Sequence, residues 1–421
     1  MRNNLLTGLV STLFVANATA QSLYVASNKH LDEAPLPFKW DVGLTTIYDD
    51  NVASANDKLK EGGLAYNPNL GLSVEQSSPL TKWSVAGVLG IIYYPDPPTL
   101  QGDKKPIDDL SNQSHINANL DHQFTERLRF TSNNMISRER EPDYSYGMAS
   151  GHSGKGEYVT LSTDDSLSFR WSKQIGTVSG VKLSNTQYPG ADSKDNNRDN
   201  IGIHNQFRYQ LSPQIVLTSA YNYSKSLSAG GQNAADSDDH YLTVGEEYRY
   251  SPTVIGIASA GAQFHSTTTG NSSTNPYVEG SLNAKVSKEI NLRSFVRYSA
   301  ESDSLNQNNV VFSEHRILRL GVTNEWAISP MFTVTNGLDY MPGTFMGGVI
   351  KGEAGAEDVP VSDRSETLVS SYVTLRMRFN DFLSGSLSYT YTNNASDLTD
   401  FLGRTQAYNR NRFSLGLSAN F

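Results

Sequence analysis

Eight charged residues of this chain could act together as a binding surface, because each occupies the polar phase of an alternating apolar and polar segment. Alternate side chains of a strand share a face, and guanidinium and ammonium groups on one face could bind anionic solutes or sugar acids. Glu246 and Glu247, together with the glutamate of the set, interrupt the basic residues and favour the alternative of a solvated wall of mixed charge. The eight residues are Arg208, Arg293, Arg297, Arg319, Arg376, Arg378, Glu279 and Lys285.

Metal binding and catalysis find little support in the residue spacing. The acidic segments 49–51 and 236–239 could offer oxygen ligands to calcium, but neither has a twelve-residue calcium loop that ends in glutamate, so solvated acids are favoured. The chain has no cysteine, no G-x-S-x-G and no P-loop. His115 and His122 share one predicted segment, but their odd separation points them to opposite faces. We therefore expect no enzyme, no cofactor and no bound metal, although spacing alone cannot reveal a Ser-His-Asp set assembled across strands.

The first twenty residues have the pattern of a signal peptide. Arg2 supplies the positive start, residues 5–15 are mostly apolar, and Ala18-Thr19-Ala20 fits a cleavage site before Gln21. The alternative, a short membrane anchor, is disfavoured because the apolar stretch is too short to span a bilayer. Removal of Arg2 changes the net charge from -9 to -10, which disfavours nucleic acid as a partner.

The remainder of the chain reads as a series of strands with period-two alternation. Polar or proline-containing segments separate the strands, and no apolar run after residue 20 is long enough for a membrane helix. We count eighteen predicted strands, at residues 38–48, 66–76, 83–94, 114–124, 128–137, 166–171, 177–185, 201–209, 215–223, 241–250, 254–265, 277–286, 292–298, 316–326, 332–340, 368–379, 382–391 and 413–421.

Short and long connections alternate along this series. Short turns on one side and long polar loops on the other are typical of an all-β transmembrane barrel, an antiparallel up-and-down β-barrel of about 18 strands (16–18). Proline is expected in the connections, Pro342 and Pro360 among them, with Pro68 as an exception inside a strand. The longest connection, 341–365, carries Glu353, Glu357, Asp358 and Asp363 and could fold inward as a constriction, as could 138–157.

This fold decides where the eight charged residues should point. A charge that faces lipid near the bilayer midplane costs about 2–4 kcal/mol, so we expect all eight to line the lumen. The predicted division is a signal peptide at 1–20, a short periplasmic N-terminal tail at 21–37 and an outer-membrane β-barrel at 38–421. Both ends of the barrel should then lie on the short-turn side.

The first and last strands carry a family resemblance. The segment Tyr48-Asp49-Asp50-Asn51-Val52, the hairpin series and the final Phe421 resemble the putative outer-membrane β-barrel porins of Gram-negative bacteria, in particular the putative beta-barrel porin 2 family. The resemblance implies location in the cell outer membrane and passive diffusion of small hydrophilic solutes. Its alternative implication is a barrel that accompanies exopolysaccharide export or surface assembly. It also implies Phe421 as a signal for the barrel assembly machinery, contact with outer-membrane lipid and a possible homo-oligomer.

Overall fold

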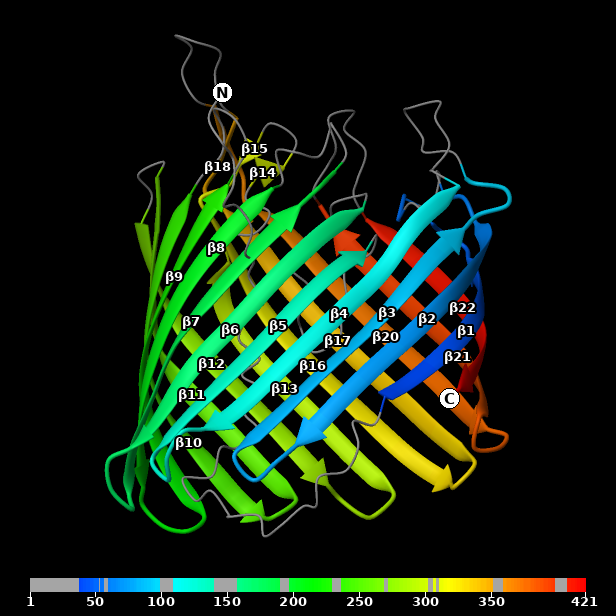
Figure 1. The fold of residues 1–421 in the computed structure, drawn as a ribbon. Helices are drawn as coiled ribbons and strands as arrows, with labels where there is room; N and C mark the ends of the chain where they lie inside the picture. The colour runs from blue at the N-terminus through cyan, green and yellow to red at the C-terminus, as the bar shows by residue number, and fades with distance from the viewer. Residues whose placement is uncertain are drawn as a thin grey trace, which may run out of the picture.

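Eighteen long strands form one closed antiparallel sheet in this computed structural model (Figure 1). The structure describes residues 38–52, 54–56, 60–98, 109–139, 157–189, 197–228, 236–268, 272–301, 306–307, 310–350, 359–397 and 407–421. The predicted signal peptide and N-terminal tail lie outside these residues. The strands of the barrel are β1 (Phe38–Asp49), β2 (Gly63–Ser77), β3 (Thr81–Tyr93), β4 (Leu110–Gln123), β5 (Leu128–Glu139), β6 (Tyr158–Arg170), β7 (Ile175–Gln187), β8 (Arg198–Gln210), β9 (Ile215–Ser228), β10 (Ser237–Ser251), β11 (Val254–Thr267), β12 (Ser272–Lys285), β13 (Ile290–Glu301), β16 (Glu314–Ser329), β17 (Phe332–Met346), β20 (Arg364–Arg378), β21 (Leu383–Ser396) and β22 (Tyr408–Asn420).

The sheet closes where β1 pairs with β22. Their register runs from Asp41 opposite Asn420 to Asp49 opposite Arg412, so the barrel has no free edge. Beyond the last pair, Phe421 and Trp40 exchange two backbone hydrogen bonds, and their rings stack 4.2 Å apart. The predicted all-β barrel and its count of eighteen strands are confirmed. No helix in the described part of the chain is long and apolar enough to cross a membrane.

The two faces of the barrel wall differ in chemistry, as the strand period requires. On β22 the outward Leu415 and Leu417 are each 55% exposed, whereas Ser414 and Ser418, on either side of them, point inward. On β1 the outward Val42 and Leu44 are exposed in the same way. An exposed apolar outer surface of this kind is stable only against lipid, so the barrel is a transmembrane one.

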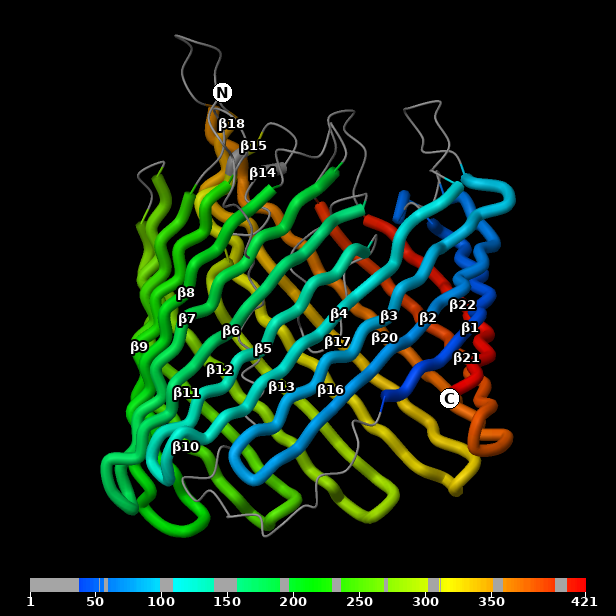
Figure 2. Tube along the Cα trace, in the orientation of Figure 1, coloured from blue at the N-terminus to red at the C-terminus, as the bar shows by residue number. Residues whose placement is uncertain are grey.

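The connections sort to opposite ends of the barrel. Short turns join the strands at the lower rim in Figure 2, where β1 begins and β22 ends, and the long connections lie at the other rim. At the long-loop rim β14 (Asn306–Gln307), β15 (Val310–Val311), β18 (Gly348–Ile350) and β19 (Val359–Val361) form a separate four-stranded sheet. It joins the β13–β16 connection to the β17–β20 connection.

The strands extend further into the long-loop side than the sequence pattern predicts. The expected loop 341–365 is wrong at both ends, since β17 continues to Met346 and β20 begins at Arg364. Pro342 therefore lies in β17 and Pro360 in β19, not in a loop. Both ladders tolerate the missing donor, because the pairing of β16 with β17 skips Pro342 and the pairing of β2 with β3 skips Pro68. Glu353, Glu357, Asp358 and residues 140–156 lie outside the described residues.

Candidate functional site: the inward face of the barrel

The eight charged residues singled out from the sequence all fall on the inward phase of their strands. Glu279 on β12 pairs in register with Arg297 on β13, which pairs with Arg319 on β16. The remaining five lie toward the short-turn ends of their strands. They are Arg208 on β8, Lys285 on β12, Arg293 on β13, and Arg376 and Arg378 on β20. That these residues form a path for solute stays a prediction.

Glu301 draws two of these arginines into one buried ion cluster. Arg319 donates to it from Nε at 3.0 Å and from Nη2 at 2.6 Å, and Arg297 donates from Nη2 at 2.9 Å. All three side chains are at least nine-tenths buried, and Arg319 is only 1% exposed. One carboxylate thus compensates much of the charge of two guanidinium groups, so this part of the wall is not an open basic track.

A second cluster lies nearer the short-turn rim, around Glu247 of β10. Its carboxylate accepts from Arg208 at 2.6 Å and from Arg249 at 2.5 Å, and it is almost fully buried. The neighbouring Glu246 points outward and is exposed, so its predicted place among the lumen charges is wrong. Adjacent residues of a strand cannot share a face, and Glu247 occupies the inward phase.

Charged side chains also approach one another across the lumen. Lys182 on β7 pairs in register with Asp164 on β6, and it also interacts electrostatically with Glu279 on β12 and Arg297 on β13. Since β7 is not a neighbour of β12 or β13 in the sheet, these side chains reach toward one another through the lumen, and we refer to this level as the narrow region. Tyr277 donates its hydroxyl to Glu279 at 2.6 Å and fixes that carboxylate in the narrow region.

The inward face is not polar throughout. Near the long-loop rim, Ile317, Met341 and Leu368 form a buried apolar cluster on β16, β17 and β20. A second pair, Phe312 and Phe345, packs with ring centroids 5.2 Å apart. The upper wall from β16 to β20 therefore contains a packed apolar layer.

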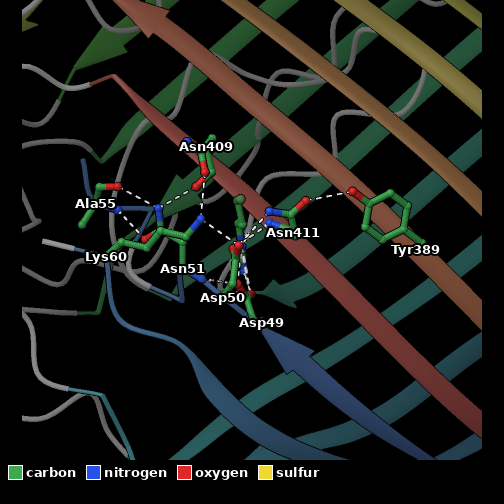
Figure 3. Close-up of polar contacts among 9 residues, drawn as sticks. Asp49, Asp50, Asn51, Ala55, Lys60, Tyr389, Asn409 and Asn411 are labelled. Carbon is green, nitrogen blue, oxygen red and sulfur yellow. Dashed lines mark hydrogen bonds and ion pairs between the residues drawn. The ribbon is translucent and has the colours of Figure 1, made fainter. Parts of the chain in front are cut away.

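A separate polar cluster locks the closing seam at the long-loop rim (Figure 3). Arg410 holds the Asp49 carboxylate with Nε at 3.0 and 2.9 Å from the two oxygens and with a further contact from Nη2. Asp50 accepts from the backbone and side-chain nitrogens of Asn411, both at 2.7 Å, and pairs with Lys60 at 2.7 Å. The cluster thus joins the end of β1 and the segment after it to the start of β22.

Asn51 completes this cluster and is fully buried. Its amide donates to the carbonyls of Ala55 at 2.7 Å and Asn409 at 2.8 Å, and its side-chain oxygen accepts from the Ala55 backbone at 2.8 Å. The favoured view of segment 49–51 as solvated acids is therefore wrong, because Asp49 and Asn51 are buried by partners from the other end of the chain. Their oxygens are also occupied, which leaves no calcium site here. Among the described residues, no group of three His, Asp or Glu side chains could hold a metal ion.

Two carboxyl groups outside the membrane have shifted pKa values. Burial alone would raise the pKa of Asp50, but hydrogen bonds from Asn411 and the Lys60 ammonium outweigh it and hold that pKa below its usual value. For Glu157, burial is likewise outweighed by hydrogen bonds from Arg138, Asn112 and Ser111, so its pKa is also lowered. Both groups therefore serve as charged anchors of the long-loop rim.

Some charges of these clusters were not predicted from the sequence, although the signal was present. Glu301 continues the inward phase of Arg293 and Arg297 but was placed in a loop. Lys182 stands out of phase with the outward Val181, which is the same pattern that marked the eight predicted residues.

Comparison with known proteins gives structural likenesses only. No family model matches the chain, and no curated protein sequence matches it. OccK1 (OpdK) of Pseudomonas aeruginosa is similar over 91% of this chain and 99% of its own, with 10% identity and a TM-score of 0.46. OccAB3 of Acinetobacter baumannii is similar over 91% of this chain and 100% of its own, with 8% identity and a TM-score of 0.46. OccK9 (OpdG) of Pseudomonas aeruginosa is similar over 91% of this chain and 99% of its own, with 11% identity and a TM-score of 0.45.

Proposed function

We propose that this protein is a porin-like channel of the outer membrane that lets small hydrophilic solutes diffuse passively. The observation that carries this proposal is the closed barrel of eighteen strands with an apolar outer face and a charged inner face. A barrel of this strand number encloses an aqueous channel, and short turns at one end with long connections at the other are typical of outer-membrane barrels. The short-turn rim would then face the periplasm.

The path of the solute runs past the lumen charges described above. Arg297 and Arg319 share the carboxylate of Glu301, and Arg208 binds Glu247, so part of the basic charge along the wall is compensated. The narrow region between Lys182 and Glu279 would admit small polar molecules without a strong preference for one sign of charge. This arrangement supports a channel for hydrophilic solutes over a dedicated anion channel.

Single-channel recording in a planar lipid bilayer tests the proposal. Purified protein, first checked for folding by heat-modifiable gel migration, should give stepwise conductance that rises with salt concentration. A folded barrel that never opens at any salt concentration would refute the channel. That result would instead fit the alternative of a barrel that works only with export or assembly partners.

A charge reversal at the narrow region tests the path. Lys182→Glu should lower the anion-to-cation permeability ratio by about twofold or more, since a charge within one Debye length of the permeating ion is little screened. The matched control is Lys173→Glu in the short turn between β6 and β7, which lies outside the narrow region and should change the ratio far less. Equal effects of the two variants would contradict a path past Lys182.

A further inference from the structure

The outward face of β5 and β6 carries a polar patch in the middle of the apolar surface. It consists of Ser132 and Asn134 on β5 and Thr163 and Asp165 on β6, all on the outward phase. Asn134 is exposed, Thr163 and Asp165 are half-buried, and Ser132 is buried. The surrounding outward side chains are apolar and exposed: Ile136 is 49%, Leu167 46% and Val181 41% exposed. Asp165 lies near the middle of β6, which has 13 residues, and therefore near the middle of the membrane.

The register fixes the outward direction of Asp165. The preceding Asp164 pairs with Lys182 and interacts with it inside the lumen, so the next side chain must point to the outside. Within the patch, Thr163 donates to Asp165 at 3.3 Å, and the Asn134 amide donates to Ser132 at 2.9 Å. One weak intramolecular hydrogen bond leaves most of the Asp165 carboxylate to its surroundings.

Lipid tails offer nothing to such a carboxylate, because they carry no hydrogen-bond donor. Away from the strand ends, Glu246 is the other acid on the outward phase of the described strands, and its register partners are Leu217 and Ala258. Asp165 differs because an amide donor and two hydroxyl groups lie beside it on the same surface. A surface with both donors and acceptors is complementary to a copy of itself.

We propose that this patch, Ser132, Asn134, Thr163 and Asp165, is the interface at which a second copy of the chain docks side by side in the membrane. Both barrels must keep the same orientation across the bilayer, which a two-fold axis along the membrane normal provides. In that arrangement Asn134 faces Asp165 of the partner subunit, and Asp165 faces the partner subunit's Asn134.

The tilt of the strands brings these two residues to the same height. Figure 2 shows β5 and β6 rising obliquely, with β6 on the upper side of β5. Ser132 pairs directly with Asp165. At a tilt of about 45°, Asn134 stands about 5 Å and Asp165 about 3 Å above Ser132 along the membrane normal. Two residues at nearly one height on adjacent strands can exchange hydrogen bonds across a vertical two-fold axis.

Cross-linking from single cysteines tests this interface, and the chain has no cysteine of its own. Asn134→Cys, treated in the membrane with a bis-maleimide of about 10 Å reach, matches the spacing of two packed sheets. The control is Val373→Cys on β20, which points outward, is 49% exposed and lies on another side of the barrel. We expect at least tenfold more dimer from Asn134→Cys. Equal yields, or coupling of Asn134→Cys to a different protein, would overturn the proposal.

Removal of the polar groups gives the second test. Asp165→Leu in the otherwise native chain should raise the dimer dissociation constant at least tenfold, measured by light scattering over a concentration series in mild detergent. Glu246→Leu removes the other outward acid and should leave the constant unchanged. A native protein that is monomeric at every concentration, or an Asp165→Leu dimer as tight as the native one, would refute the interface. Conductance of the folded Asp165→Leu barrel should be unchanged, which separates this proposal from the channel itself.

Discussion

The ion pair between Asp49 and Arg410 should stabilise the closing seam strongly. The side chain of Asp49 is 3% exposed and that of Arg410 is 12% exposed, so solvent screens their attraction little. Arg410→Ala would leave a buried carboxylate that still accepts a hydrogen bond from the Asn51 backbone N–H at 2.9 Å but has lost its cationic partner. Loss of one partner from a buried pair costs about 3–5 kcal/mol. We expect a destabilisation of this size, and a smaller one when Asp49→Ala is added, because no carboxylate then remains unpaired.

Denaturant unfolding of the refolded barrel in lipid vesicles measures these free energies. Tryptophan fluorescence follows the unfolding, and Trp40 on β1 contributes a signal from the seam. The control is the ion pair of Lys39 and Glu75, which also involves β1 but has both side chains 63% exposed. Removal of Lys39 should cost at most about 1 kcal/mol. If Arg410→Ala cost no more than Lys39→Ala, or if the double-mutant cycle showed no coupling, the seam pair would not have the role assigned here.

Three further predictions concern the rim, the wall and the C-terminus. The lowered pKa of Asp50 means that its charged form adds stability above its unfolded pKa, near 3.9, and that this stability is lost as pH falls through the folded pKa. The unfolding free energy of Asp50→Asn should therefore fall less steeply than that of the native protein when the pH drops below about 4. Equal slopes for the variant and the native protein would contradict this. Gln263→Ala should cost about 1–3 kcal/mol and speed amide exchange at Ala300, whose N–H and C=O the Gln263 amide binds at 2.8 and 2.7 Å. Unchanged exchange there would show that the two bonds are dispensable. Phe421→Ala should cost about 0.5–1.5 kcal/mol through loss of its ring stack, but should reduce the amount of barrel inserted in cells much more. Normal insertion would argue against an assembly signal.

Period-two alternation was enough to predict the barrel, because nearly every strand has one apolar and one polar face. It failed where that contrast is lost. The strand expected at 166–171 in fact begins at Tyr158, since the outward positions Thr163 and Asp165 are polar like the inward ones. Thr163 and Asp165, which removed the alternation from this part of the strand, thus belong to the patch proposed to bind a second copy.

The inward phase of a charge was predictable, but its partner was not. Arg297 and Arg319 were expected in the lumen from the pattern of their own strands. Their shared carboxylate comes from Glu301, which lies beyond the predicted end of its strand at residue 298. Lys182 and Glu279 interact only because the closed sheet curves β7 and β12 around one lumen. Register and closure are properties of the whole sheet, so no local window of sequence contains them.

The environment of a charged residue in this barrel follows from two coordinates, its phase and its height. The inward phase places Glu301 among arginines, and a position at the rim gives Asp49 its partner from the other end of the chain. Asp165 has the outward phase at mid-height, where lipid alone would leave the carboxylate unsolvated. Unlike Glu246, Asp165 has hydrogen-bonding groups beside it on the same face, and under a two-fold axis the partner subunit's Asn134 is the contact that symmetry can supply.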